Sequence, residues 1–198
     1  MGKELYHKGL LKGTSGNISA RITNTNTFLI KPSGAKIENL KPEELILVDL
    51  DGNRISGKRD VSAETPMHAA IYRKRKDAQA VAHTHAPTAT AFGIAGKEIL
   101  PLQIEVFMRL PKGVPIVPFK QPGSKSLAIA VQKKMVDYDA VILENHGIVT
   151  IGSSLESACS LNEIVEEAAK IQLIVMSLSG GNVNNLPKLK EKFKTQDT

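Results

Sequence analysis

The chain has 198 residues, of which 41% are hydrophobic and 23% are charged, and it contains a single cysteine, Cys159. A chain of this size supports one well-buried core but not two ordinary domains, so we expect a single domain over residues 1–198, with about 183–198 as a flexible or helical tail. One cysteine excludes an internal disulfide framework, and neither a secretory signal nor an apolar run near the ~20 residues of a membrane span is present. We therefore expect a cytoplasmic protein without membrane contact.

The net charge of +6 suits an acidic partner or an anionic substrate. The basic run from Arg73 to Lys76 is the obvious candidate for nucleic-acid contact, but it stands at the end of a helical pattern, where cations offset the helix dipole. Aromatic residues, on which nucleic-acid bases stack, make up only 4% of the chain. We therefore expect no nucleic-acid partner.

Short strands and helices alternate along the chain. A first helix is expected over 3–12, stopped by Gly13. Alternating apolar and polar residues between turn signals predict strands over 17–22, 28–34, 45–55 (turned at Asp51-Gly52), 80–86, 113–119 (a proline-interrupted edge) and 139–152 (two strands joined at Glu144 to Gly147). Helical spacing of apolar residues predicts helices over 63–75, 88–96 and 124–135.

The last helix begins in "SSLE", where Ser153 and Glu156 have the spacing of a capping box, and Ser179-Gly180-Gly181 stops it. Strands outnumber helices and the two are mixed in order. This pattern predicts an α/β fold of the α+β type, a single domain in which helices flank a central, mostly antiparallel β-sheet.

Two histidines stand one residue apart in "VAHTHAPTA", residues 81–89. Residues two apart in a strand project to one face about 6–7 Å from each other, so His83 and His85 can converge on one ion. His146, in "LENHGIV", lies at a turn between two apolar strands. Three imidazoles that leave one position open are the pattern of a catalytic zinc site. For the "HTH" fragment alone, ordinary buried histidines remain the alternative.

Glu64, in "VSAETP", opens a helix where the dipole favours a carboxylate, although an ordinary first-turn glutamate fits this fragment equally. His68 follows four residues later. That spacing also allows metal binding, but a histidine on the helix face is the more ordinary interpretation.

Six segments in succession resemble the class II aldolase/adducin amino-terminal family, and most closely its L-fuculose-phosphate aldolase-like enzymes: "GTSGNISAR", "IKPSG", "SAETPMHAAIY", "DAQAVAHTHAPTATAFG", "VPIVPFKQPGS" and "ILENHGIVTIG". The resemblance implies one Zn²⁺ per chain on His83, His85 and His146. It implies that Glu64 can ligate the resting metal and act as a base once substrate displaces it. It also implies a homotetramer with active sites at subunit boundaries.

The glycine turns "GTSGN" and "PSG" are suited to a phosphate, because backbone N–H groups and short hydroxyls can approach it closely there. Taken alone, either is equally an ordinary tight turn. The resemblance places the phosphate contacts of a sugar-phosphate substrate on Asn17, Ser33, Gly34 and Ser62. The serine that fuculose aldolases carry after Ser62 is Ala63 here, and Lys31 is a candidate for the compensating charge.

The resemblance leaves the reaction open between two lyases. Fuculose aldolases carry a proton-donating tyrosine in the segment where this chain has "LQIEVFMRL", with Glu105 and no tyrosine. Methylthioribulose-1-phosphate dehydratases use a glutamate near this position as an acid–base. We expect zinc-dependent cleavage of a ketose or deoxyketose 1-phosphate to dihydroxyacetone phosphate and an aldehyde, with Glu64 moving the proton and Glu105 as a second catalytic candidate. The alternatives are the dehydratase and a non-enzymatic, adducin-like binding module.

Overall fold

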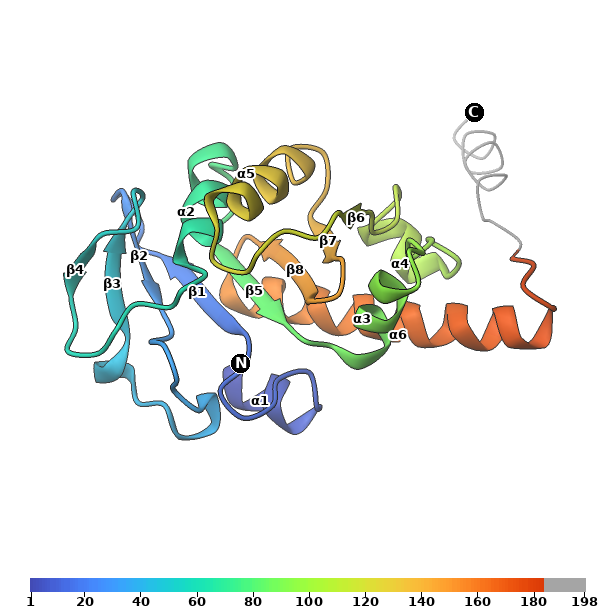
Figure 1. Cartoon of the computed structure of the whole chain (residues 1–198), viewed down its shortest axis with the longest axis horizontal. Coiled ribbons are helices and arrows are strands. Elements are labelled where there is room, and N and C mark those ends of the chain that lie inside the picture. Colours follow the sequence, from blue (N-terminus) through green and yellow to red (C-terminus); the bar gives the residue numbers. More distant parts are fainter. Residues whose placement is uncertain (184–198) are drawn as a thin grey trace, which may run out of the picture.

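The computed structural model describes residues 1–183 of the chain, which form one eight-stranded sheet in the order β4-β3-β2-β1-β5-β8-β7-β6 (Figure 1). Neighbouring strands are antiparallel except β6 and β7, which are parallel. The predicted α+β fold with a mostly antiparallel sheet is therefore confirmed. The strands are β1 (Asn17–Arg21), β2 (Thr27–Ile30), β3 (Ile46–Asp49), β4 (Arg54–Ser56), β5 (Ala80–Thr84), β6 (Ile116–Val117), β7 (Ala140–Leu143) and β8 (Gly147–Gly152).

Helices cover both faces of the sheet. The hydrophobic core on one face lies under α2 and α5, and the core on the other face lies against α1, α3, α4 and α6. The long helix α6 crosses behind β5 and β8 and extends beyond the end of the sheet (Figure 1). The helices are α1 (Gly2–His7), α2 (Thr65–Lys74), α3 (Pro87–Ile94), α4 (Ile104–Arg109), α5 (Lys125–Lys134) and α6 (Leu155–Leu178), with 3-10 turns η1 (Ile37–Asn39) and η2 (Pro42–Glu44).

Strand β5 divides its side chains between the two cores. Ala82 belongs to the core against α6, and Val81 belongs to the core under α2 and α5, as the two-residue period of a strand requires. His83 therefore shares the α2 face with Val81. Thr84 faces α6, where its hydroxyl donates to Asn162 Oδ1 over 2.6 Å. Since β1 and β8 pair with the two edges of β5, all five of its residues are buried.

The differences from the predicted elements lie mostly at the ends of helices and strands, as in β6, which has only Ile116–Val117 of the predicted 113–119. Helix α1 ends at His7 and not at residue 12, because the chain turns at Gly9 with a φ of 75°. Helix α6 is capped by Ser154, whose Oγ accepts from Ser157 N, so the prediction of Ser153 as the cap is wrong by one residue. Helix α4 is an additional element that the sequence did not predict.

The basic run ends helix α2, as expected from its position in the sequence. Arg73 and Lys74 form the last turn of the helix, and the Arg75 guanidinium binds Asp77 at 2.6 Å and Asp139 at 2.7 Å. No helix within residues 1–183 has the length and hydropathy that crossing a bilayer requires. The predicted tail lies, from residue 184 onward, outside the described residues.

Candidate active site

Three histidines gather where β5 ends and β8 begins. His83 lies in β5, His85 just after it, and His146 just before β8. Their ring centroids are 5.1, 4.7 and 5.2 Å apart in pairs, and one ring nitrogen of each lies within 4.8 Å of the other two. This spacing allows the three imidazoles to hold a single metal ion.

The tight turn between β7 and β8 brings His146 to its place. Asn145 adopts a φ of 57°, a left-handed conformation that asparagine tolerates better than most residues. Gly147 follows, and a Cβ there would lie 2.2 Å from Thr84 O and 3.0 Å from His85 Cδ2. Any side chain at this position would therefore push the two histidine-bearing segments apart.

The ring orientation of His83 suits a metal ligand. Its Nδ1 lies 2.9 Å from Ile148 O, and because a carbonyl can only accept, Nδ1 carries a proton. In the neutral ring the lone pair is then on Nε2, which lies 2.9 Å from Glu64 Oε2 without a hydrogen-bond partner. A backbone acceptor on the far nitrogen is how proteins fix the tautomer of a metal-ligating histidine.

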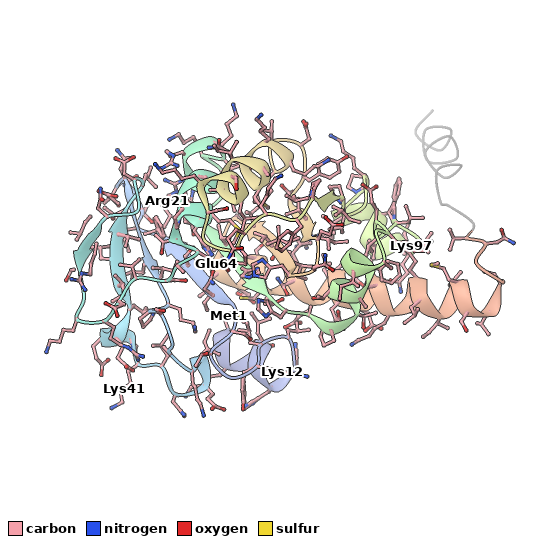
Figure 2. All side chains as sticks on the ribbon, viewed as in Figure 1. Met1, Lys12, Arg21, Lys41, Glu64 and Lys97 are labelled. Atoms are coloured by element: carbon pink, nitrogen blue, oxygen red, sulfur yellow. The ribbon has the colours of Figure 1, made fainter. Side chains whose placement is uncertain are left out.

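Glu64 stands beside the histidines at the start of α2, and Figure 2 shows it near the middle of the molecule. Its carboxylate is almost fully buried. Oε2 accepts a hydrogen bond from Asn17 Nδ2 over 3.1 Å, whereas Oε1 lies 3.4 Å from His146 Nε2 and has no hydrogen-bond partner. One oxygen is thus anchored, and the other is free to bind a metal ion or exchange a proton.

Unpartnered buried atoms around this cluster fit a bound cation. Glu64 Oε1, His83 Nε2 and His146 Nδ1 are buried without a hydrogen-bond partner among the described residues, although buried polar atoms are normally paired. Burial is the largest cause that lowers the pKa of His85 to about 4, and burial also lowers the pKa of His146. Both rings are therefore neutral at pH 7, the form that binds a metal.

Glu64 supplies the negative charge of the site. Burial raises its pKa, but the neighbouring imidazoles of His83 and His146 and the hydrogen bond from Asn17 outweigh burial, so the pKa lies well below its ordinary value. Burial lowers the pKa of His83, and the Glu64 carboxylate outweighs that effect and raises it. A metal dication at this point would lie between the His83 Nε2 lone pair and the Glu64 carboxylate, which are 2.9 Å apart.

The structure brings the two glycine turns together. Lys31, almost fully buried after β2, donates from Nζ to Thr14 O in the "GTSGN" turn over 2.9 Å. In the "PSG" turn, Ser33 is exposed, its N–H donates to Asp60 O, and its carbonyl accepts from Arg59 Nη2 over 3.4 Å. Burial, together with the charge of Arg59, lowers the pKa of Lys31. Two cations beside exposed turns make this region suitable for an anion.

Ser62 contacts the residue that stands beside the histidine cluster. It lies two residues before Glu64, whose N–H donates to Ser62 Oγ over 3.3 Å. Gly34 follows Ser33 in the exposed turn, and Ala63 is also exposed.

Asn17 has a contact that the sequence did not predict. It pairs with His83 in the β1–β5 register, and its carboxamide bridges Glu64 and His68, donating to Glu64 from Nδ2 and contacting His68 Nε2 through Oδ1. His68 is fully buried on α2 and does not belong to the histidine cluster, which agrees with its interpretation as a helix-face residue. The missed signal was the polar residues at every second position of β1: Asn17, Ser19 and Arg21.

Glu105 lies apart from the histidine cluster in one chain. It is exposed on α4 and lines a cavity of about 440 Å³ together with residues of α6 and of the segment after α1, among them Lys8, Glu163 and Lys170. The residues lining this cavity include neither Glu64 nor any of the three histidines. Within the described part of a single chain, the structure therefore does not bring the two predicted catalytic carboxylates together.

Residues 1–173 match the family described as Class II Aldolase and Adducin N-terminal domain. The chain is 36% identical over 170 residues to the 5-deoxy-D-ribulose 1-phosphate aldolase of Bacillus thuringiensis serovar kurstaki, across 86% of this chain and 79% of the relative. It is 31% identical over 176 residues to the 3-oxo-tetronate 4-phosphate decarboxylase of Haemophilus influenzae, across 86% and 82%. The crystal structure of L-fuculose-1-phosphate aldolase from Thermus thermophilus superposes with a TM-score of 0.82 at 30% identity, across 92% and 94%. The chain therefore belongs to the class II aldolase and adducin N-terminal family and is a carbon–carbon lyase of the class II type.

Proposed function

We propose that the protein is a zinc-dependent aldolase that cleaves a ketose or deoxyketose 1-phosphate, similar to L-fuculose 1-phosphate, to dihydroxyacetone phosphate and an aldehyde. The observation that carries this proposal is the group of three histidines with the free Oε1 of Glu64 beside it. Three imidazole nitrogens and an open position suit zinc, and Glu64 can complete the shell of the resting metal. The names of the relatives support the choice of a sugar phosphate.

The histidines and Glu64 have different roles in the proposed reaction: the histidines hold the metal that stabilises charge, and Glu64 transfers the proton. Zinc on His83, His85 and His146 would stabilise the negative charge that develops on the ketose oxygens as the C3–C4 bond breaks. In this proposal, Glu64 Oε1 carries the proton that leaves the C4 hydroxyl, which becomes the aldehyde carbonyl, and returns it to C3. Asn17 holds Oε2 meanwhile, so the carboxylate keeps its orientation.

In this proposal, the phosphate group of the substrate binds between the two glycine turns. Lys31 and Arg59 supply the positive charge, and Lys31 is held there by its hydrogen bond to Thr14 O. Hydrogen bonds come from the residues that the resemblance implied: Asn17, Ser33, Gly34 and Ser62. Asn17 can take part because only one of its two amide protons is used by Glu64.

Replacing Lys31 by methionine tests this phosphate site. Loss of a charge-assisted hydrogen bond, about 1.5–3 kcal/mol, should raise KM for the phosphorylated substrate roughly 10- to 100-fold, with kcat little changed. The KM of the unphosphorylated analogue should stay the same. Lys41→Met is a matched control, since Lys41 is exposed and lies at the lower left edge of the molecule, away from Glu64 (Figure 2). Equal KM changes for both substrates would contradict the phosphate assignment.

The reaction itself is tested by product identification. The zinc-loaded protein is incubated with a panel of ketose 1-phosphates and deoxyketose 1-phosphates, and dihydroxyacetone phosphate is measured. The panel includes methylthioribulose 1-phosphate and a phosphorylated 3-oxo acid, because one relative is a decarboxylase. We expect dihydroxyacetone phosphate from at least one ketose. Release of carbon dioxide, or loss of water without cleavage, would replace the aldolase proposal.

The proposal includes the homotetramer that the resemblance implies. Ile104 and Met108 on α4 are 51% and 72% exposed, and apolar side chains of this kind are commonly covered at subunit contacts. A site at a subunit boundary would allow Glu105 of one subunit to reach the histidine cluster of its neighbour.

A further inference from the structure

A continuous row of buried hydrogen bonds begins at Glu64 and runs between α2 and β1. Helix α2 and its N-cap contribute Glu64, His68 and Tyr72 at intervals of four residues, and β1 contributes Asn17 and Ser19 at an interval of two. Four helical residues rise about 6 Å and two strand residues rise about 6.6–6.8 Å, so the two rows advance almost in step. The side chains of the two rows therefore alternate, and each one contacts the next in the order Glu64, Asn17, His68, Ser19, Tyr72.

All five side chains of this row are buried. Asn17 is 5% exposed, Ser19 3% and Glu64 8%, and His68 and Tyr72 are not exposed at all. Arg21 closes the far end, with its guanidinium 4.8 Å from the centre of the Tyr72 ring and Nη2 donating to Tyr72 O. Leaving such buried polar groups unpaired costs free energy. In each hydrogen bond of the row, one group must therefore donate where its neighbour accepts.

The direction of the first two bonds follows from the Glu64 carboxylate, which can only accept. Asn17 must turn its NH₂ group to Oε2, 3.1 Å away, and its Oδ1 then faces His68 Nε2. Because an amide oxygen can only accept, His68 Nε2 must carry a proton. The orientation of the Asn17 amide and the tautomer of His68 therefore determine each other.

The remaining bonds run in the same direction. Burial, together with the charge of His83, lowers the pKa of His68 to about 3, so its ring is neutral and Nδ1 has a lone pair. Nδ1 accepts the hydroxyl proton of Ser19 over 2.7 Å, and Ser19 in turn accepts from the Tyr72 hydroxyl over 2.8 Å. Every proton in the row thus points toward Glu64.

We propose that His68 is a positioning residue of the reaction: as the Nε2–H tautomer it holds the Asn17 amide in the orientation that anchors Glu64 Oε2 and leaves Oε1 free. Turned the other way, the amide would present its oxygen to the carboxylate and repel it. The inference rests on the proposed function only in taking Glu64 as the proton carrier. The hydrogen-bond row stands without any substrate.

Two substitutions of His68 separate this role from simple packing. Glutamine can place an amide N–H where Nε2 stands, which keeps the donor to Asn17, whereas leucine removes it. We expect His68→Leu to lower kcat about 10- to 100-fold, as outer-shell changes do, with KM and metal content little changed, and His68→Gln to restore most of kcat. Gln132→Met is the matched control, because Gln132 also donates to α2, at Ala70 O, without touching the row.

The tautomer is measured directly on the metal-free protein at neutral pH, from two-bond ¹H–¹⁵N correlations of the histidine rings. The His68 signals are assigned by their disappearance in His68→Gln. We expect a neutral ring protonated at Nε2, and this readout holds whether or not the enzyme proves to be an aldolase. A ring protonated at Nδ1, or equal losses of kcat in the glutamine and leucine variants, would overturn the proposal.

Discussion

Replacing any one of His83, His85 and His146 by alanine should remove most of the bound zinc and nearly all activity. The three rings lie in mutual contact around one point, so the loss of one leaves an incomplete shell. Metal analysis should find one zinc per chain in the unaltered protein and much less in each variant. The thermal midpoint of the unaltered protein should rise with added zinc, since a ligand that binds only the folded state stabilises it.

A matched control is available for this series. His7 is exposed in helix α1 and does not belong to the cluster, so His7→Ala should keep both zinc and activity. Circular dichroism of each variant checks that the fold persists. Full retention of zinc in two of the three cluster variants would show that the metal is held elsewhere.

Glu64→Gln should abolish most turnover while leaving the metal in place. Glutamine has the same shape as glutamate and can still accept from Asn17 Nδ2, and the three histidines still hold zinc, but the amide cannot carry the proton. We expect kcat to fall roughly 10²–10⁴-fold, the effect of losing a general base, with near-normal zinc content. Steady-state kinetics and metal analysis on the same preparation measure both quantities.

Glu105→Gln, measured on the same substrate, separates the aldolase from the dehydratase. In aldol cleavage Glu64 is the principal proton carrier, so Glu105→Gln should have the smaller effect. A dehydratase needs a second acid–base away from the metal-bound oxygens, and Glu105 is the candidate. If Glu105→Gln loses activity while Glu64→Gln keeps it, and no dihydroxyacetone phosphate forms, the aldolase proposal is wrong and the dehydratase is favoured.

The three histidines of the candidate metal site could be found in the sequence because they lie in short local patterns. His83 and His85 stand two apart in an apolar segment, and His146 adjoins a glycine at a turn. The two-residue period of a strand and the residues typical of a turn therefore indicate these histidines even when it is not known which strands pair. Their convergence still depended on the family resemblance. The structure adds the reason for Gly147: a Cβ there would collide with the carbonyl oxygen of Thr84, a residue 63 positions earlier in the chain.

Features that depend on tertiary contact were not predictable. The partnership of Asn17 with His68 depends on how α2 lies across β1, which no local pattern of either segment determines. Helix α4 is short and carries apolar residues on several sides, so its pattern did not stand out. The cap of α6 was misplaced because Ser153 and Ser154 are adjacent and only the local backbone selects between them.

The sheet order also bears on how the protein folds. Strand β5 has its two neighbours in distant parts of the chain: β1 precedes it by three strands and a helix, and β8 follows after three helices and two strands. Both pairings close long loops, which costs chain entropy and slows folding. The histidines meet only when β5 and β8 have paired, and Asn17 joins Glu64 only when β1 has docked. A metal ion held by these histidines would therefore bind a nearly finished structure, where it would slow unfolding and not nucleate folding.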